Sequence, residues 1–167
     1  MTRMKLVVSQ LCQVRGYTSK LLDAIKSADW FRMPADGVTH VAWQVGHLAM
    51  AESRLALQRV RGQKPDDAEL ISDDFLALFG KGSVPNPDAA MYPTPEEIRS
   101  VFDGVHRQTV EELQSLPEAI FDESTDVQPH PMFNTKLGAV QWCALHEMSH
   151  AGQIGLLRRL CGNDPLW

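Results

Sequence analysis

Apolar side chains recur every three or four positions in four long segments of the chain, which is the spacing of one buried helical face. The segments cover about residues 5–27, 39–62, 94–117 and 136–161. No stretch of four to eight residues alternates apolar and polar side chains between turn signals, so strands have little support. The pattern predicts an all-α protein built from four long helices. Thr39 is the expected N-cap of the second helix.

The third helix has the clearest start signal. Thr94 can accept a hydrogen bond from the backbone of Glu97, and the Glu97 side chain can return one, which makes a capping box. The connection over residues 62–92 is long for a loop between helices, and residues 66–79 can form one or two short helices within it. A long crossover between the second and third helices indicates a bundle that is not simply up-down-up-down.

Composition narrows the class of protein. A chain of 167 residues, 44% hydrophobic and 22% charged, fits one globular domain over residues 1–167. The formal net charge of −5 argues against a nucleic-acid partner. No apolar run approaches the roughly 18 residues of a membrane span. Three cysteines, Cys12, Cys143 and Cys161, without a secretory signal are typical of a reducing compartment, so we expect a cytoplasmic location.

The main chemical signal is the string His-Glu-Met-Ser-His at residues 146–150. It places two imidazoles four positions apart on one helical face, where both can bind one metal ion. The string also matches the H-E-x-x-H pattern of zinc peptidases, in which the glutamate is the general base. A third ligand should then follow, but residues 151–167 contain no histidine or glutamate, and Gln153 and Leu156 replace the glycine and histidine of the extended pattern.

A third ligand must therefore come from upstream, where the candidates are His40, His47, His106 and His130. His47 is favoured because it lies mid-helix beside the apolar stripe, and Gly46 allows close approach of another backbone. Packed helix axes lie about 8–10 Å apart, so imidazoles of two helices can share one ion. His40 lies two turns earlier, about 10.5 Å away, and we expect it to be a terminal or surface histidine.

Two segments together resemble the DinB-like (YfiT-like) superfamily, whose members are assigned as metal-dependent enzymes. They are residues 43–48, Trp-Gln-Val-Gly-His-Leu, with Glu52 following, and residues 146–154, His-Glu-Met-Ser-His-Ala-Gly-Gln-Ile. The chain length, the helix order and the ending Pro165-Leu166-Trp167 are similar as well. The resemblance implies an up-down-down-up four-helix bundle with one divalent ion held by three histidines, His47, His146 and His150.

The resemblance implies no single reaction, because the superfamily includes thiol-dependent isomerases and transferases as well as hydrolase-like members. Three imidazoles leave a position for water or substrate, and imidazole suits zinc and nickel, the two metals we expect. We therefore predict hydrolysis of a small molecule, or activation of a low-molecular-weight thiol for transfer or isomerisation. The alternative is a non-catalytic stress-response or binding module with a structural metal and a fourth protein ligand. The resemblance and uncovered apolar helix surface also predict a homodimer.

Several side chains near the predicted site have more than one reading. Glu147 lies about 100° around the helix from His146, and it either acts in catalysis or serves only solubility. Gln153 could orient a ligand imidazole or a bound water. Cys143, one turn before His146, could be a soft ligand, although a buried apolar role is commoner.

Three further side chains are weaker candidates. His106 lies near the buried stripe of the third helix, where a local hydrogen bond is the simpler role, and His130 lies in a loop whose position the spacing does not reveal. Glu52 is about 140° from His47 and is excluded as a co-ligand on an ideal helix, which leaves it a salt bridge or a buried hydrogen bond.

Overall fold

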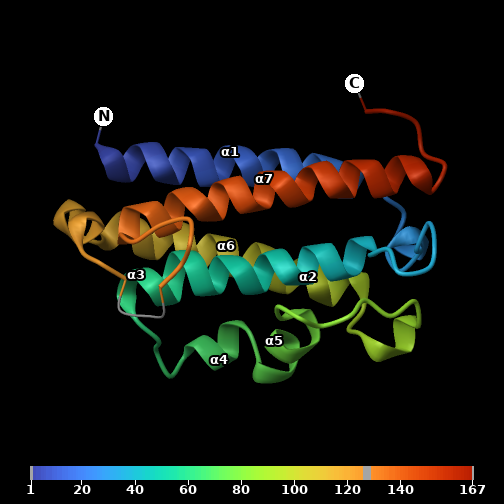
Figure 1. The fold of residues 1–167 in the computed structure, drawn as a ribbon, viewed down its shortest axis with the longest axis horizontal. Coiled ribbons are helices and arrows are strands. Elements are labelled where there is room, and N and C mark those ends of the chain that lie inside the picture. The colour runs from blue at the N-terminus through green and yellow to red at the C-terminus, as the bar shows by residue number, and fades with distance from the viewer. Residues whose placement is uncertain (1, 126–128, 167) are drawn as a thin grey trace.

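The computed structural model describes residues 2–125 and 129–166. Its longest helices are α1 (Arg3–Asp23), α2 (Val41–Glu52), α6 (Pro95–Ser115) and α7 (Lys136–Leu160). Figure 1 shows these four lying lengthwise against one another. The described residues form no strand, only two isolated bridges, so the all-α prediction is confirmed. Trp167, part of the ending used in the resemblance, lies outside the described residues.

The second predicted helix is one continuous rod with an irregular middle. After α2 the chain passes through a π-helical segment, η2 (Ser53–Gln58), into α3 (Arg59–Arg61). Gly62 ends the rod with φ of +83°, a left-handed conformation that glycine adopts without strain. The predicted end of this helix is therefore confirmed, and the π-helical segment was not foreseen.

The predicted cap of this helix was wrong, and His40, expected as a terminal or surface histidine, lies at the helix terminus but is buried. The cap is His40, whose Nδ1 accepts a hydrogen bond from the backbone of Trp43 at 3.1 Å. Its Nε2 donates to the carbonyl of Asn86 at 3.0 Å, and the ring is fully buried between the rings of Phe31 and Tyr92. Burial lowers the pKa of His40 to about 4, so a neutral ring serves as a structural cap.

The long crossover between α3 and α6 contains the short helices predicted for it. They are α4 (Asp67–Leu70) and α5 (Asp73–Phe79), followed by the single turn η3 (Ala89–Met91). In Figure 1 both α4 and α5 lie along the α2 side of the molecule, and α5 packs directly on α2. This packing brings the end of α5 to the middle of α2. The remaining short turns are η1 (Ser27–Asp29) and η4 (Glu118–Asp122).

Helix α6 begins and ends as its sequence predicts. The hydroxyl of Thr94 accepts from the backbone of Glu97 at 3.2 Å, and the Glu97 carboxylate accepts from the backbone of Thr94 at 2.8 Å. The helix stops at Ser115, two residues before Pro117. Because these signals are local, they could be read without any knowledge of the fold.

A single buried arginine on α1 connects the four long helices. The Arg15 guanidinium donates to both carboxylate oxygens of Glu147 on α7, at 3.0 and 3.1 Å. It also donates to the Glu52 carboxylate on α2 at 2.6 Å and to the Phe102 carbonyl on α6 at 2.7 Å. The side chains of Arg15, Glu52 and Glu147 are 7%, 1% and 3% exposed. A charged group this deeply buried is stable only when fully paired, so these contacts fix how the helices face one another.

Among the described residues, no helix combines the length and the apolar character needed to cross a bilayer.

Candidate metal centre

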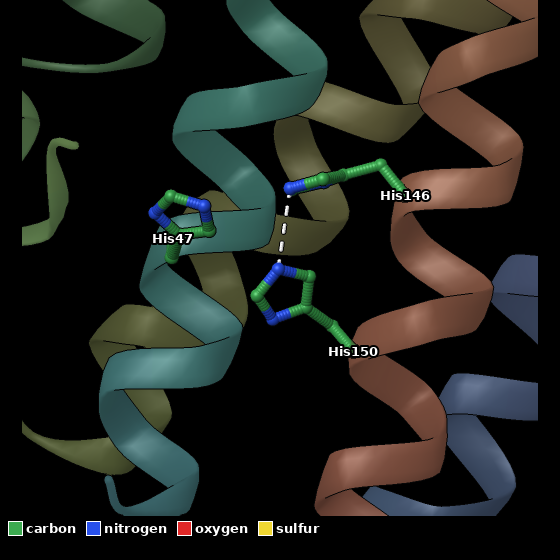
Figure 2. A group of neighbouring side chains, drawn as sticks. All are labelled: His47, His146 and His150. Carbon is green, nitrogen blue, oxygen red and sulfur yellow. Dashed lines mark hydrogen bonds between the residues drawn. The ribbon is translucent and has the colours of Figure 1, made fainter.

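Three histidines from two helices converge between α2 and α7. Figure 2 shows His47 projecting from α2 toward His146 and His150 on α7. One ring nitrogen of each lies within 4.8 Å of the others. The Nε2 atoms of His146 and His150 are 3.2 Å apart, close enough for both to bind one ion at Zn–N distances of about 2.0–2.1 Å. The site predicted from the sequence is therefore brought together, and its donors fit a divalent ion.

His47 is held by the crossover that follows α3. Its Nδ1 donates to the Phe79 carbonyl at 2.9 Å, so Nε2 carries the free lone pair. The Trp43 ring stacks on the imidazole, with 4.7 Å between centroids and 13° between planes. The Trp43 indole N–H in turn donates to the hydroxyl of Ser83 at 2.9 Å. These contacts leave the ring of His47 one orientation.

The close approach of α5 depends on Gly46, as the sequence suggested. A Cβ atom at this position would lie 2.4 Å from ring atoms of Phe79, inside any allowed contact distance. Glycine therefore lets the fully buried Phe79 pack on α2 and bring its carbonyl to the next residue, His47.

His150 is oriented by a pair of amides. The Gln44 side-chain oxygen accepts a short hydrogen bond from Nδ1 of His150, and Gln44 Nε2 donates to the Gln153 side-chain oxygen at 3.2 Å. With the Gln44 amide in this orientation, Nδ1 of His150 carries the proton and Nε2 is unprotonated. The Nε2 atoms of His146 and His150 face each other at 3.2 Å, where both can bind one cation.

Gln153, expected to orient a ligand imidazole or a bound water, contacts the amide of Gln44 and not the ring of His150. Gln44 itself was missed at the level of the sequence. It is 1% exposed and falls on the apolar stripe of α2, three residues after Val41 and four before Leu48. A polar side chain on a buried stripe was the signal that could have identified it.

The surroundings keep the three imidazoles neutral. Burial, together with the charge of neighbouring histidines, lowers the pKa of His146 to about 4 and that of His150 to about 3. Burial also lowers the pKa of His47. Each ring therefore offers an unprotonated nitrogen at neutral pH, the form that binds a metal ion.

The other predicted candidates lie outside the group of three among the described residues. Both oxygens of Glu147 accept from Arg15, so this carboxylate belongs to the interior ion pair. Cys143 is 3% exposed, and burial raises the pKa of its thiol well above the ordinary value. A thiol in that state is a poor metal ligand, because the thiolate is the binding form.

The two remaining histidines have partners of their own. Nδ1 of His106 contacts the Glu52 carboxylate at 2.9 Å, which is the hydrogen-bonding role expected for both residues. His130 stacks on Phe133 with centroids 4.2 Å apart, and its ring centroid is 6.1 Å from that of Trp142, one turn before His146. The loop carrying His130 therefore lies next to the metal centre, although His130 is not one of the three ligands.

Comparison with known proteins identifies the family of the chain. No curated protein matches the chain. The sequence profile of the DinB superfamily, in contrast, matches residues 10–154, a span that includes α2, α6 and the three histidines. The match covers well over half of the chain and confirms the resemblance recognised from residues 43–48 and 146–154. The protein with this histidine centre between α2 and α7 therefore belongs to the DinB superfamily.

Proposed function

We propose that the protein is a metal-dependent enzyme that acts on a small molecule, with His47, His146 and His150 holding one divalent ion. The observation that carries the proposal is the convergence of three neutral imidazoles, with 3.2 Å between the Nε2 atoms of His146 and His150. When bound, such an ion supplies a Lewis acid that makes water or a small thiol nucleophilic near neutral pH. Zinc or nickel is the metal we propose, because imidazole suits both.

The ligand count favours catalysis over a purely structural metal. Structural zinc sites are closed by four protein ligands, whereas catalytic sites keep one position open. Among the described residues, no cysteine or carboxylate joins the three histidines. Cys143, one candidate for the fourth ligand of the structural alternative, is buried outside the group. We therefore propose hydrolysis, or thiol-dependent transfer or isomerisation.

Neighbouring residues orient the ligand histidines and cover one of them. The Phe79 carbonyl and the Gln44 amide each bind the Nδ1 proton of one ligand ring and direct its Nε2 inward. Trp43 covers one face of His47 and limits the access of water from that side. Glu147 was predicted as a catalytic residue, but its geometry favours a role in positioning, because Arg15 occupies both of its oxygens.

Three further features belong to the proposal. The up-down-down-up order is supported by Figure 1, where the colours run left to right along α1 and α7 and right to left along α2 and α6. A cytoplasmic location is supported by three cysteines that are all free, one of them exposed.

A homodimer is supported by four exposed apolar side chains on α7, Leu145, Met148, Leu156 and Leu160. Light scattering of the purified protein tests the dimer, and a monomer across micromolar concentrations rejects it.

Metal content is the first test of the function. We expect about one divalent ion per chain in the wild type and a large loss in His146→Ala. Ser149→Ala, an exposed change on the same helix, is the matched control and should keep the ion. Equal metal content in wild type and His146→Ala would end the proposal.

Turnover is the second test. Ester, amide and phosphoester compounds, and then electrophiles supplied with small thiols, should be screened with metal-loaded and chelated protein. Turnover that needs the metal supports the enzyme, and its dependence on thiol separates transfer or isomerisation from hydrolysis. No turnover, combined with a cobalt spectrum that shows four protein ligands, would favour the structural module instead.

A further inference from the structure

We propose that the substrate of this centre is a small organic anion whose carboxylate or phosphate group is bound by Arg54; this inference rests on the function proposed above. Arg54 follows His47 by seven residues on the same rod, which is two helical turns and about 10.5 Å along the axis. It lies in the π-helical segment η2, and such irregularities are frequent at functional sites. Its side chain is exposed and available to a ligand.

The helices that carry the ligands leave no negative charge at the centre. Residues 41–61 and 136–160 include two acidic side chains, Glu52 and Glu147. Both are buried and bound to Arg15 on the α1 side of the bundle. The ligand-bearing side of α2 and α7 therefore has no acidic side chain of its own that would repel an anion.

Three basic side chains lie near the centre or near His130, namely Arg54, Arg59 and Lys81. Within residues 2–125 and 129–166, neither Arg54 nor Lys81 forms a salt bridge, and both are exposed. Seven residues along a helix return to nearly the same direction, so Arg54 lies close to the face of the rod that carries His47. The charges of Arg59 and Lys81 contribute, after burial, to the lowered pKa of His130. Arg54 thus places positive charge beside the centre, and Arg59 and Lys81 place it near His130.

Three aromatic rings, those of Trp142, His130 and Phe133, lie close to one another near the metal centre. Trp142 precedes His146 by one turn, and the ring centroid of His130 lies 6.1 Å from that of Trp142 and 4.2 Å from that of Phe133. The Arg59 guanidinium carbon is 5.3 Å from the Phe133 centroid. Flat apolar surfaces beside cations suit a ligand that combines a planar apolar body with a charged group.

The positive region is a local feature, because the protein as a whole carries a net charge of −5. A general affinity for anions would need a basic surface throughout, and this chain lacks that balance. Positive charge near the histidines therefore indicates selection of a charged substrate at this site.

Benzoate, phosphate and benzamide are the probes that test this inference, measured by calorimetry on metal-loaded and on chelated protein. Benzamide has the shape of benzoate without its charge. We expect benzoate or phosphate to bind at least about tenfold more tightly than benzamide, because the charged group gains charge-assisted hydrogen bonds. Binding of benzoate alone identifies a carboxylate substrate, and binding of phosphate alone identifies a phosphorylated one.

Three variants locate the anion. Arg54→Glu should weaken binding of the anion by about tenfold or more, and Arg54→Lys should restore most of it. Arg107→Glu makes the same charge change at an exposed position on α6 and should leave binding unchanged. Equal affinity for benzoate and benzamide, or equal losses in the two glutamate variants, would overturn the inference.

The two proposals fail in different ways. Metal content is measured on the same samples, so a protein that binds its ion and shows no preference for anions rejects only the anion site. A protein that binds no metal rejects the metalloenzyme, and the chelated arm still reports whether Arg54 binds the anion.

Discussion

The side-chain oxygen of Gln44 on α2 accepts a hydrogen bond from Nδ1 of His150 on α7, residues separated by 106 positions in the chain. The contact selects the tautomer of His150 whose Nε2 faces the other two imidazoles. Gln153 holds the Gln44 amide in the matching orientation. A buried glutamine therefore decides which nitrogen of His150 is available to a metal ion.

Removing the Gln44 amide should weaken the metal site without unfolding the protein. We expect Gln44→Ala to lower metal affinity about 10–100-fold, the usual effect of losing a side chain that orients a ligand histidine. Gln44→Glu keeps an acceptor and should retain most of the affinity. Competition with a chelator measures the affinity, and nitrogen NMR reports the tautomer of His150. Gln141→Ala, an exposed change on α7, is the control. Unchanged affinity in Gln44→Ala would show that the hydrogen bond between Gln44 and His150 is incidental.

A methyl group at Gly46 should separate α5 from α2. We expect Gly46→Ala to lower the free energy of unfolding by roughly 1–3 kcal/mol, because the new Cβ would lie 2.4 Å from the Phe79 ring. Metal affinity should fall as well, since the Phe79 carbonyl then loses its place at His47. Urea unfolding measures the first effect. The control is Gly16→Ala in α1, where nothing lies within 4 Å of the new atom and a gain of up to about 1 kcal/mol is expected.

Replacing the buried Arg15 should lower the free energy of unfolding far more than replacing an arginine at the surface. We expect Arg15→Met to destabilise the fold by about 3–5 kcal/mol, because Glu52 and Glu147 are left buried without their cation. Adding Glu52→Gln and Glu147→Gln should recover part of the loss. Arg99→Ala, which breaks partly exposed pairs with Asp23 and Asp103, should have a much smaller effect. Similar losses for Arg15→Met and Arg99→Ala would show that the ion pairs in the core contribute little.

Acid should remove the stability that Glu52 contributes. Burial acts to raise the pKa of Glu52, but the charge of Arg15 and the hydrogen bond from His106 outweigh it, so the pKa in the folded state is lowered from 4.5. A carboxylate with a lowered pKa stabilises the fold above its unfolded pKa, and this contribution disappears as the pH falls through the folded value. Glu52→Gln should therefore be less stable than wild type at pH 7, and the gap should narrow below about pH 4.5.

Urea unfolding of chelated wild type and Glu52→Gln at pH 7, 5, 4 and 3 measures this difference in the free energy of unfolding. Chelation removes any contribution of bound metal from both proteins. A gap that stays constant from pH 7 to pH 3 would contradict the assignment of a stabilising charge to Glu52.

The sequence alone determined the features that depend on residues close together in the chain. The apolar periodicity located the four long helices, and the capping box placed the start of α6 at Thr94. The spacing of His146 and His150 placed both imidazoles on one face, because a helix repeats its direction nearly every four residues. The family was recognised from residues 43–48 and 146–154 for the same reason, since each motif is a short local pattern.

The tertiary structure alone decided how the helices face one another. Sequence spacing says nothing about the register between α2 and α7, so the contact of Gln44 with His150 could not be predicted. The same holds for Glu147: its sequence neighbours suggested catalysis, yet Arg15, 132 positions away, binds both of its oxygens. His40 was expected at a helix terminus or at the surface; it caps α2, and the crossover buries its ring. Burial and pairing depend on distant parts of the chain, and these are set only when the helices pack.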